Sequence, residues 1–141
     1  MKTYFDSSVL IAAMVAEEIH HERGVDALSD SKDGFTCNHA LSEVFATLTG
    51  GRLNLQLSPA EAAELIENNV ANRLAILDLS TADYRKAIVD CQSVDARGGG
   101  IFDMLHLQAA RRGKAARIFT INVRHFQTFA PDLSGIIRLP S

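Results

Sequence analysis

The fold is decided by the stretch TYFDSSVL at Thr3–Leu10, in which a single acid separates two apolar runs. The first run is Lys2–Phe5 and the second is Val9–Val15. A short run followed by a longer one behind polar residues predicts a strand at Thr3–Phe5 and a capped helix at Ser8–Ala16. A chain that begins in this way can place a polar side chain at the end of a buried strand.

Two further acids lie in apolar surroundings. Asp6 stands at the junction just described, Glu43 lies within Ala40–Leu48, and Asp103 interrupts Ile101–Ala110. Carboxylates that are far apart in sequence, each attached to a predicted core element, need a common explanation. We favour a shared divalent-metal site that cuts a phosphodiester backbone.

Strand-like and helix-like segments alternate along the rest of the chain. Capping signals are clearest at Ser58-Pro59-Ala60-Glu61, where a helix should begin and run to about Val70, and at Ser80–Asp83, which should cap a helix to about Ser93. Gly113 should end a helix that begins near Phe102. The remaining predicted helices are His20–Ser29 and one that Asn38 caps and the Gly50-Gly51 pair ends; the remaining predicted strands are Phe35–Cys37, Leu74–Leu79, Ile118–Ile121 and Ile136–Leu139.

This alternation predicts an α/β fold with a central, mostly parallel sheet of short strands and helices on both faces. The 141 residues suit a single domain spanning positions 1–141. Sites in such sheets form at the carboxyl ends of the strands. Asp6 and Asn122 both follow predicted strands, so we expect them at the same edge of the sheet.

The composition is that of an ordinary globular protein, with 47% hydrophobic and 22% charged residues. A net charge of −3 gives no overall attraction for nucleic acid, which would have to bind a local basic patch or metal ions. Cys37 and Cys91 are expected to be small buried residues in a reducing compartment, and a disulfide between them is the alternative that the sequence leaves open. Without a leader or an apolar run of roughly 20 residues, we expect a cytoplasmic protein with no membrane contact.

The three acids differ in how strongly the sequence supports them. Asp103 shares a helical stripe with Leu107 and Ala110. The helix dipole accounts for an acid in a first turn but not for one inside an apolar stripe, which favours a functional role. Asp6 has a structural alternative as a helix cap, although the following serines would cap equally well. Glu43 points off the centre of its apolar stripe, so a solvated side chain is the default.

Other polar residues have two interpretations each. Asn122 is either a turn residue or a neutral oxygen ligand, and Thr120 is either a strand residue or a hydroxyl that orients a carboxylate. His106 follows Asp103 on the same side of the helix, but no second histidine or cysteine has matching spacing, which favours a packed or hydrogen-bonded ring over a transition-metal ligand. His20-His21 are neighbours and make a poor chelate.

Basic residues gather near the end of the same helix. They are candidates for RNA-phosphate contacts, although the helix dipole alone attracts cations to such a position. The residues are Arg111, Arg112, Lys114 and, slightly further along, Arg124.

Four motifs in register resemble those of the PIN-domain ribonucleases, and specifically the VapC-like toxins of bacterial toxin–antitoxin pairs. The similarity covers essentially the whole chain. The motifs are Tyr4–Ile11 (YFDSSVLI), Leu41–Val44 (LSEV), Phe102–Ala110 (FDMLHLQAA) and Ile118–Phe126 (IFTINVRHF).

The resemblance implies that Asp6, Glu43 and Asp103 bind Mg²⁺ or Mn²⁺ and hydrolyse RNA phosphodiester bonds, and that Ser8 and Thr120 support this cluster. It also implies a homodimer and a cognate antitoxin that covers the active-site groove, with DNA reached only through the antitoxin. Many relatives carry a fourth acid at position 122. The neutral residue here leaves open whether one or two metal ions bind.

Two alternatives remain open at this point. One is a catalytically weak PIN module that acts mainly as a DNA-bound regulatory partner of an antitoxin, and Asn122 is the residue that favours it. The other is a PIN nuclease of RNA maturation, which a small antitoxin-like reading frame directly upstream would argue against.

Overall fold

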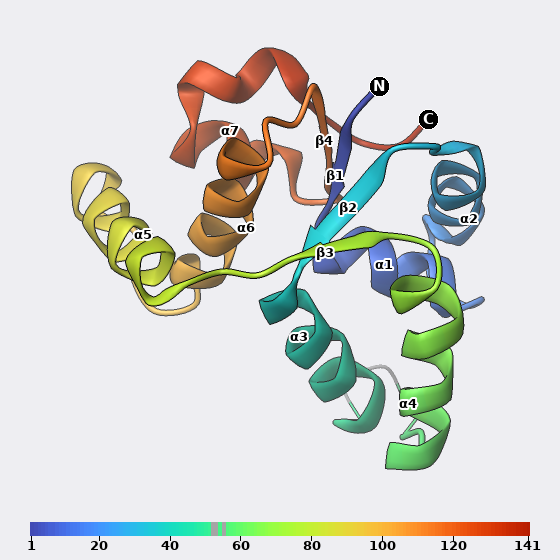
Figure 1. The fold of residues 1–141 in the computed structure, drawn as a ribbon. Coiled ribbons are helices and arrows are strands. Elements are labelled where there is room, and N and C mark those ends of the chain that lie inside the picture. Colours follow the sequence, from blue (N-terminus) through green and yellow to red (C-terminus); the bar gives the residue numbers. More distant parts are fainter. Residues whose placement is uncertain (52–53, 55) are drawn as a thin grey trace.

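Five parallel strands form the central sheet of this computed structural model, which describes residues 1–51, 54 and 56–141 (Figure 1). Their order is β3-β2-β1-β4-β5. The strands are β1 (Thr3–Phe5), β2 (Gly34–Cys37), β3 (Ala75–Leu77), β4 (Arg117–Phe119) and β5 (Ile137–Arg138). Tyr4 in β1 is paired with Phe35 on one side and with Ile118 on the other. The central strand is therefore the buried one, as its apolar sequence predicts.

Helices cover both faces of the sheet, which confirms the predicted α/β class. In Figure 1, α1 and α2 lie on one side of the strands and α6 and α7 on the other, with α5 outside α6. The helices are α1 (Ser7–Met14), α2 (His21–Asp30), α3 (Asn38–Thr49), α4 (Pro59–Ile66), α5 (Thr81–Val94), α6 (Gly100–Arg112) and α7 (Val123–Phe129). A π-helical turn at Glu67–Ala71 extends α4, and a 3₁₀ helix at Pro131–Ile136 precedes β5.

The order of the strands creates a switch point between β1 and β4. From β1 the chain moves outward to β2 and then to β3, through α1 to α4. It then crosses back through α5 and α6 to β4, and continues outward in the other direction to β5. The connections that leave β1 and β4 thus diverge, and a crevice forms at such a point outside the carboxyl ends of the strands. Asp6 and Thr120 directly follow these two strands.

Both predicted capping boxes are present. Ser58 and Glu61 bond each other's backbone at the start of α4, and Ser80 and Asp83 do the same at the start of α5. These local signals are reliable because side chain and backbone donors lie within one helical turn.

Of two further predicted caps, the one at Asn38 is wrong and the one at Gly113 is confirmed. Asn38 is the first residue of α3 rather than its cap; its side-chain oxygen instead accepts the backbone N–H of Leu79 at 3.0 Å and so joins the ends of β2 and β3. Gly113 ends α6 as predicted, but with φ −80°, which any residue can adopt. A Cβ at Gly113 would overlap the Phe35 ring, so glycine is needed there for space.

Among the described residues, no helix combines the length and apolar character that a membrane crossing requires.

Candidate active site

Asp6 is a buried carboxylate at the end of β1, with 2% of its surface exposed. It caps α1, because one carboxylate oxygen accepts the backbone N–H of Val9 at 3.0 Å. The expectation that the serines would replace it as the cap is therefore wrong. An acid at the N-terminus of a helix is also favoured by the helix dipole. Capping thus accounts for where Asp6 lies without excluding a second role.

Two hydroxyls bind the Asp6 carboxylate from either side. Ser8 donates to one oxygen at 2.6 Å, and Thr120 donates to the other at 2.6 Å. Ser8 also accepts the backbone N–H of Ile121 at 3.0 Å, which ties the start of α1 to the segment after β4. Burial raises the pKa of Asp6, and these hydrogen bonds together with nearby His106 partly offset that rise. Both hydroxyls lie where a group that supports the carboxylate would have to lie.

Glu43 enters the same region from α3. Its side chain is 23% exposed, and its Oε1 lies 2.7 Å from Nε2 of His106. The Ser7 hydroxyl donates to its other oxygen at 3.4 Å. The freely solvated side chain that helical periodicity favours is therefore not observed. A contact from a distant helix holds Glu43 toward the site.

His106 is buried on α6, where residues of sheet strands and of neighbouring helices surround it. Its Nδ1 lies 2.6 Å from the Tyr4 hydroxyl, and its ring packs edge-on against Tyr4 with centroids 5.7 Å apart. Burial lowers the pKa of His106, but the adjacent Cys37 thiol and Glu43 carboxylate outweigh burial and raise the pKa to about 10. The prediction of a hydrogen-bonded rather than metal-binding histidine agrees with this placement.

Asp103 lies in the first turn of α6 and is half buried. Its pKa is raised to about 6, first by burial and further by the charges of Asp6 and Glu43, while His106 and His125 act in the opposite direction. Within the described part of the chain, its carboxylate accepts no hydrogen bond. Asp103 is thus the acid of the three whose negative charge is least compensated.

A hollow of about 420 Å³ opens beside Glu43, which is the one of the three acids that lines it. Its described lining carries the carboxylates of Glu18 and Glu43 and no lysine or arginine, so a polyanion would need a cation to approach. The lining residues are Ser7, Ser8, Ile11, Glu18, Ile19, His20, Glu43, Thr47 and Ile121.

Comparison with known proteins identifies the family. The sequence model of the PIN domain matches residues 3–129. This chain belongs to the PIN domain family. The four motifs and the site described above all lie inside the matched segment.

Proteins similar to this PIN domain include one ribonuclease by sequence and two crystal structures by fold. The chain is 28% identical over 110 residues to ribonuclease VapC27 of Mycobacterium tuberculosis, a match that covers 78% of this chain and 77% of that one. The crystal structure of M. tuberculosis VapC20, described as a sarcin–ricin loop cleaving toxin, shares the fold with a TM-score of 0.73 at 14% identity, over 93% of this chain and 95% of that chain. VapBC2 from Rickettsia felis, solved bound to a DNA fragment from its promoter, shares the fold with a TM-score of 0.64 at 15% identity. The match covers 90% of this chain and 92% of that chain. The resemblance to VapC-like proteins that the motifs carry is confirmed.

The remaining predicted residues of the PIN domain lie at different distances from the acids. Asn122 is exposed just before α7, and its backbone N–H donates to the Thr120 hydroxyl at 3.0 Å. Arg124 is exposed in the first turn of α7, two residues further along. Both lie on the segment that follows β4, and so near the rim of the site.

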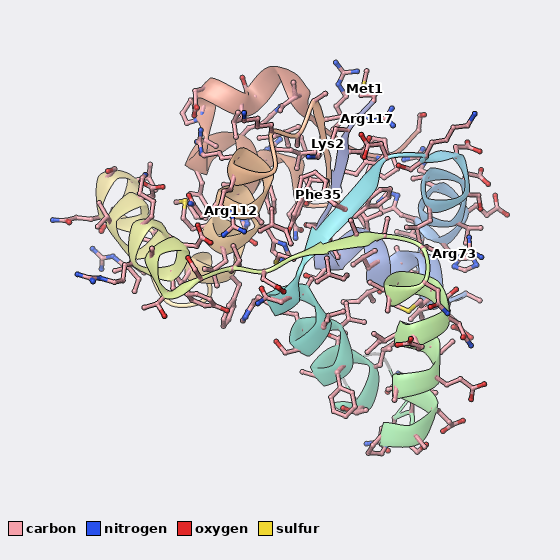
Figure 2. The ribbon with its side chains drawn as sticks, viewed as in Figure 1. Met1, Lys2, Phe35, Arg73, Arg112 and Arg117 are labelled. Atoms are coloured by element: carbon pink, nitrogen blue, oxygen red, sulfur yellow. The ribbon has the colours of Figure 1, made fainter. Side chains whose placement is uncertain are left out.

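The other basic candidates lie toward the far end of α6. Arg111 and Arg112 are eight and nine residues beyond Asp103, or about 12–14 Å along the helix. Arg111 is paired with Asp132, and Arg112 with Asp83; Figure 2 shows Arg112 on the side of α6 that faces α5. Lys114 follows the end of α6 and is exposed. These three cations are therefore separated from the acids, and two of them already have acidic partners.

Sequence reasoning missed the part that Tyr4 plays in the PIN domain site. A tyrosine in a fully buried strand needs a partner for its hydroxyl, which is the signal that could have revealed it. The partner is His106, 102 positions away, which no helical or strand periodicity connects to Tyr4.

The chemistry of the donors fits a hard divalent cation. Carboxylate oxygens are the ligands that Mg²⁺ and Mn²⁺ prefer, and Asp103 presents a half-buried carboxylate whose pKa is raised first by burial and further by the charges of Asp6 and Glu43. In the part of the chain that the structure describes, no group of three or more His, Cys, Asp or Glu side chains is arranged to hold a metal ion by itself. Mg²⁺ usually retains several waters and binds through only one or two carboxylates together with substrate phosphate, so the carboxylates present still suit it.

Proposed function

We propose that this PIN domain is a metal-dependent endoribonuclease of the VapC type, with Mg²⁺ or Mn²⁺ held by Asp6, Glu43 and Asp103. The observation that carries the proposal is the half-buried Asp103 carboxylate, which accepts no hydrogen bond from the described residues and whose pKa is raised by burial and by the charges of two other acids, Asp6 and Glu43. Clustered like charges with a raised pKa are costly to the fold and are characteristic of functional sites. A bound cation removes that cost.

The chain's own residues have distinct tasks in this proposal. Ser8 and Thr120 hold the Asp6 carboxylate by both oxygens, so its orientation is fixed before substrate arrives. The cation, when bound, would lower the pKa of an attacking water and offset charge on the scissile phosphate. The acidic hollow beside Glu43 is where we place the RNA strand, and its charge makes binding there depend on the cation.

We further propose that the substrate is single-stranded or looped RNA, because bases in loops are unstacked and accessible. The description of VapC20 as a sarcin–ricin loop cleaving toxin supports this class of substrate. By the same likeness we propose a cognate antitoxin, a homodimer, and contact with DNA only through the antitoxin, as the VapBC2 complex with promoter DNA suggests.

One alternative has an observation in its favour. Asn122 is exposed at the rim of the site and carries no charge, where many relatives have an acid. A PIN module with weakened catalysis, acting as a regulatory partner of its antitoxin, would tolerate that substitution.

Cleavage of an RNA panel with Mg²⁺ or Mn²⁺ tests the proposal. Asp6→Asn and Asp103→Asn should abolish cleavage, and the same substitution at exposed Asp26 on α2 should not. Asparagine caps helices nearly as well as aspartate, so Asp6→Asn removes the charge and keeps the cap. Circular dichroism should show all variants folded.

The alternatives predict different outcomes of the same assay. A wild-type protein that cuts no RNA with any divalent ion would favour the regulatory module. In cells that express the wild-type protein, sequencing of RNA 5′ ends should show new cleavage sites. These sites should be absent when Asp103→Asn is expressed instead. The absence of both such ends and any growth defect would contradict the toxin proposal.

A further inference from the structure

A buried chain of hydrogen bonds runs from the core to the edge of the site. It joins Tyr4 of β1 to His106 of α6 at 2.6 Å, and His106 to Glu43 of α3 at 2.7 Å. Tyr4 has no exposed surface and His106 has 2%. The only end of this chain that approaches solvent is the Glu43 carboxylate, which lines the hollow.

The direction of the bond to Glu43 follows from the chemistry of the groups. An ionised carboxylate can only accept, so Nε2 of His106 carries the hydrogen and donates it. The Tyr4 hydroxyl can donate or accept, and therefore satisfies Nδ1 in either protonation state of the ring. The bond from His106 to Glu43 thus persists whichever state the histidine adopts.

The His106 ring has little freedom to turn. Tyr4 packs against it edge-on, Phe126 packs at a centroid distance of 6.4 Å, and Phe35 in turn meets Tyr4 edge-on at 5.2 Å. Aromatic packing of this kind fixes the ring plane, so the Nε2–H points in one direction. The long, flexible Glu43 side chain is thus held by a donor whose ring is packed on two sides.

Other contacts of Glu43 are weaker. Ser7 donates at 3.4 Å, at the limit of a hydrogen bond, and His39 Nε2 lies 3.9 Å from Oε1. Without His106, only these two weaker contacts among the described residues would oppose the turning of the Glu43 side chain toward water, which its place on the flank of the α3 stripe favours.

We propose that His106, backed by Tyr4, is a positioning residue that holds the Glu43 carboxylate in the site and so sets the affinity for the divalent ion. This rests on the proposed function, in which Glu43 is one of the metal-binding acids. Partners that orient a ligand from behind typically change metal affinity about 10- to 100-fold when they are removed.

Mn²⁺ binding to the full chain, followed by calorimetry or electron paramagnetic resonance, is the direct test. His106→Leu should weaken Mn²⁺ binding about 10- to 100-fold. His106→Gln should recover most of that loss, because an amide can donate to Glu43 and accept from Tyr4. Cleavage by His106→Leu should be restored largely by raising the Mn²⁺ concentration, with KM for RNA unchanged.

Two variants separate positioning from loss of stability. Leu107→Ala truncates an equally buried neighbour on α6 that has no group able to hydrogen-bond Glu43; it should lower the melting temperature and leave Mn²⁺ affinity unchanged. Tyr4→Phe keeps the ring and removes one hydrogen bond, so it tests the proposal even if His106→Leu does not fold. Its Mn²⁺ affinity should fall about fivefold, the value of one ordinary hydrogen bond.

Glu43→Gln distinguishes the positioning role of His106 from the proposed role of Glu43 as a metal ligand. If it loses Mn²⁺ affinity and cleavage while His106→Leu and Tyr4→Phe retain both, the positioning role is wrong and the proposed function stands. If Glu43→Gln itself binds Mn²⁺ and cuts RNA like wild type, Glu43 is not a ligand, and that part of the proposed function fails together with the inference.

Discussion

Replacing Asp103 with asparagine should stabilise the metal-free protein at alkaline pH. Its pKa is raised to about 6 in the folded chain from an ordinary value of 3.8, first by burial and then by Asp6 and Glu43. The folded state therefore binds the proton more tightly than the unfolded state does. The stabilising effect of the protonated group is fully present below the unfolded pKa and is lost as the pH rises through about 6. Asparagine resembles the protonated form at every pH.

The magnitude follows from the difference in pKa. The pKa difference between the folded and unfolded states corresponds to at most about 3 kcal/mol in the free energy of unfolding at pH 8. Partial exposure of Asp103 to solvent reduces this to about 1–1.5 kcal/mol. The free energy of unfolding, measured by urea denaturation in EDTA, should be higher for Asp103→Asn than for wild type by that amount at pH 8. The two proteins should converge near pH 4. Asp26→Asn should stay within about 0.5 kcal/mol of wild type throughout.

Adding Mg²⁺ at pH 8 should reverse the order of stability. A ligand that binds only the folded state stabilises it by mass action, and the variant lacks one of the proposed ligands. A difference in unfolding free energy that does not depend on pH would refute the reasoning. So would an Asp103→Asn variant that is less stable than wild type in EDTA at pH 8, because the carboxylate would then be compensated by a partner.

Three further predictions concern the surroundings of the site. Thr120→Val removes the 2.6 Å hydrogen bond to Asp6, and should cost about 1–3 kcal/mol in the free energy of unfolding and weaken Mn²⁺ binding, both measurable by titration. Gly113→Ala places a methyl group against the Phe35 ring and should lower the free energy of unfolding by about 1–3 kcal/mol. Gly135→Ala, which has open space around its Cβ, should stay within about 0.5 kcal/mol of wild type in the same denaturation series. Removing divalent ions with EDTA should abolish RNA cleavage on a gel, and restoring Mg²⁺ or Mn²⁺ should recover it; cleavage that persists in EDTA would contradict the proposed function.

The local elements of the fold could be predicted because their signals lie within a few residues of one another. The capping boxes at Ser58 and Ser80 each join a side chain and a backbone group three positions apart, and both are present in the structure. The alternation of strands and helices likewise predicts a parallel sheet. What it does not predict is that β4 returns to lie beside β1, because many strand orders share the same alternation. The switch point that brings Asp6 and Thr120 together depends on that return.

The site was harder to predict where one residue serves two purposes or is held from a distance. Asp6 caps α1 and accepts hydrogen bonds from Ser8 and Thr120, so the sequence could not separate a structural role from a functional one. Glu43 lies on the flank of the apolar stripe of its helix, and helical periodicity predicts a solvent-exposed side chain at such a position. Only the fold shows that His106, 63 residues away, turns it inward.

The three acids differ in how their charges are balanced, and this difference is the strongest physical argument for a cation. Asp6 receives hydrogen bonds from two hydroxyls and a backbone N–H, and Glu43 receives one from His106. For Asp6, these donors partly offset the rise in pKa that burial causes. Asp103 has no such donor among the described residues, yet lies close enough to the other two for their charges to raise its pKa. A fold that required only buried carboxylates would compensate all three. Leaving one free beside two fixed ones reduces stability unless a cation binds there, and retaining that cost is expected of a site that binds one.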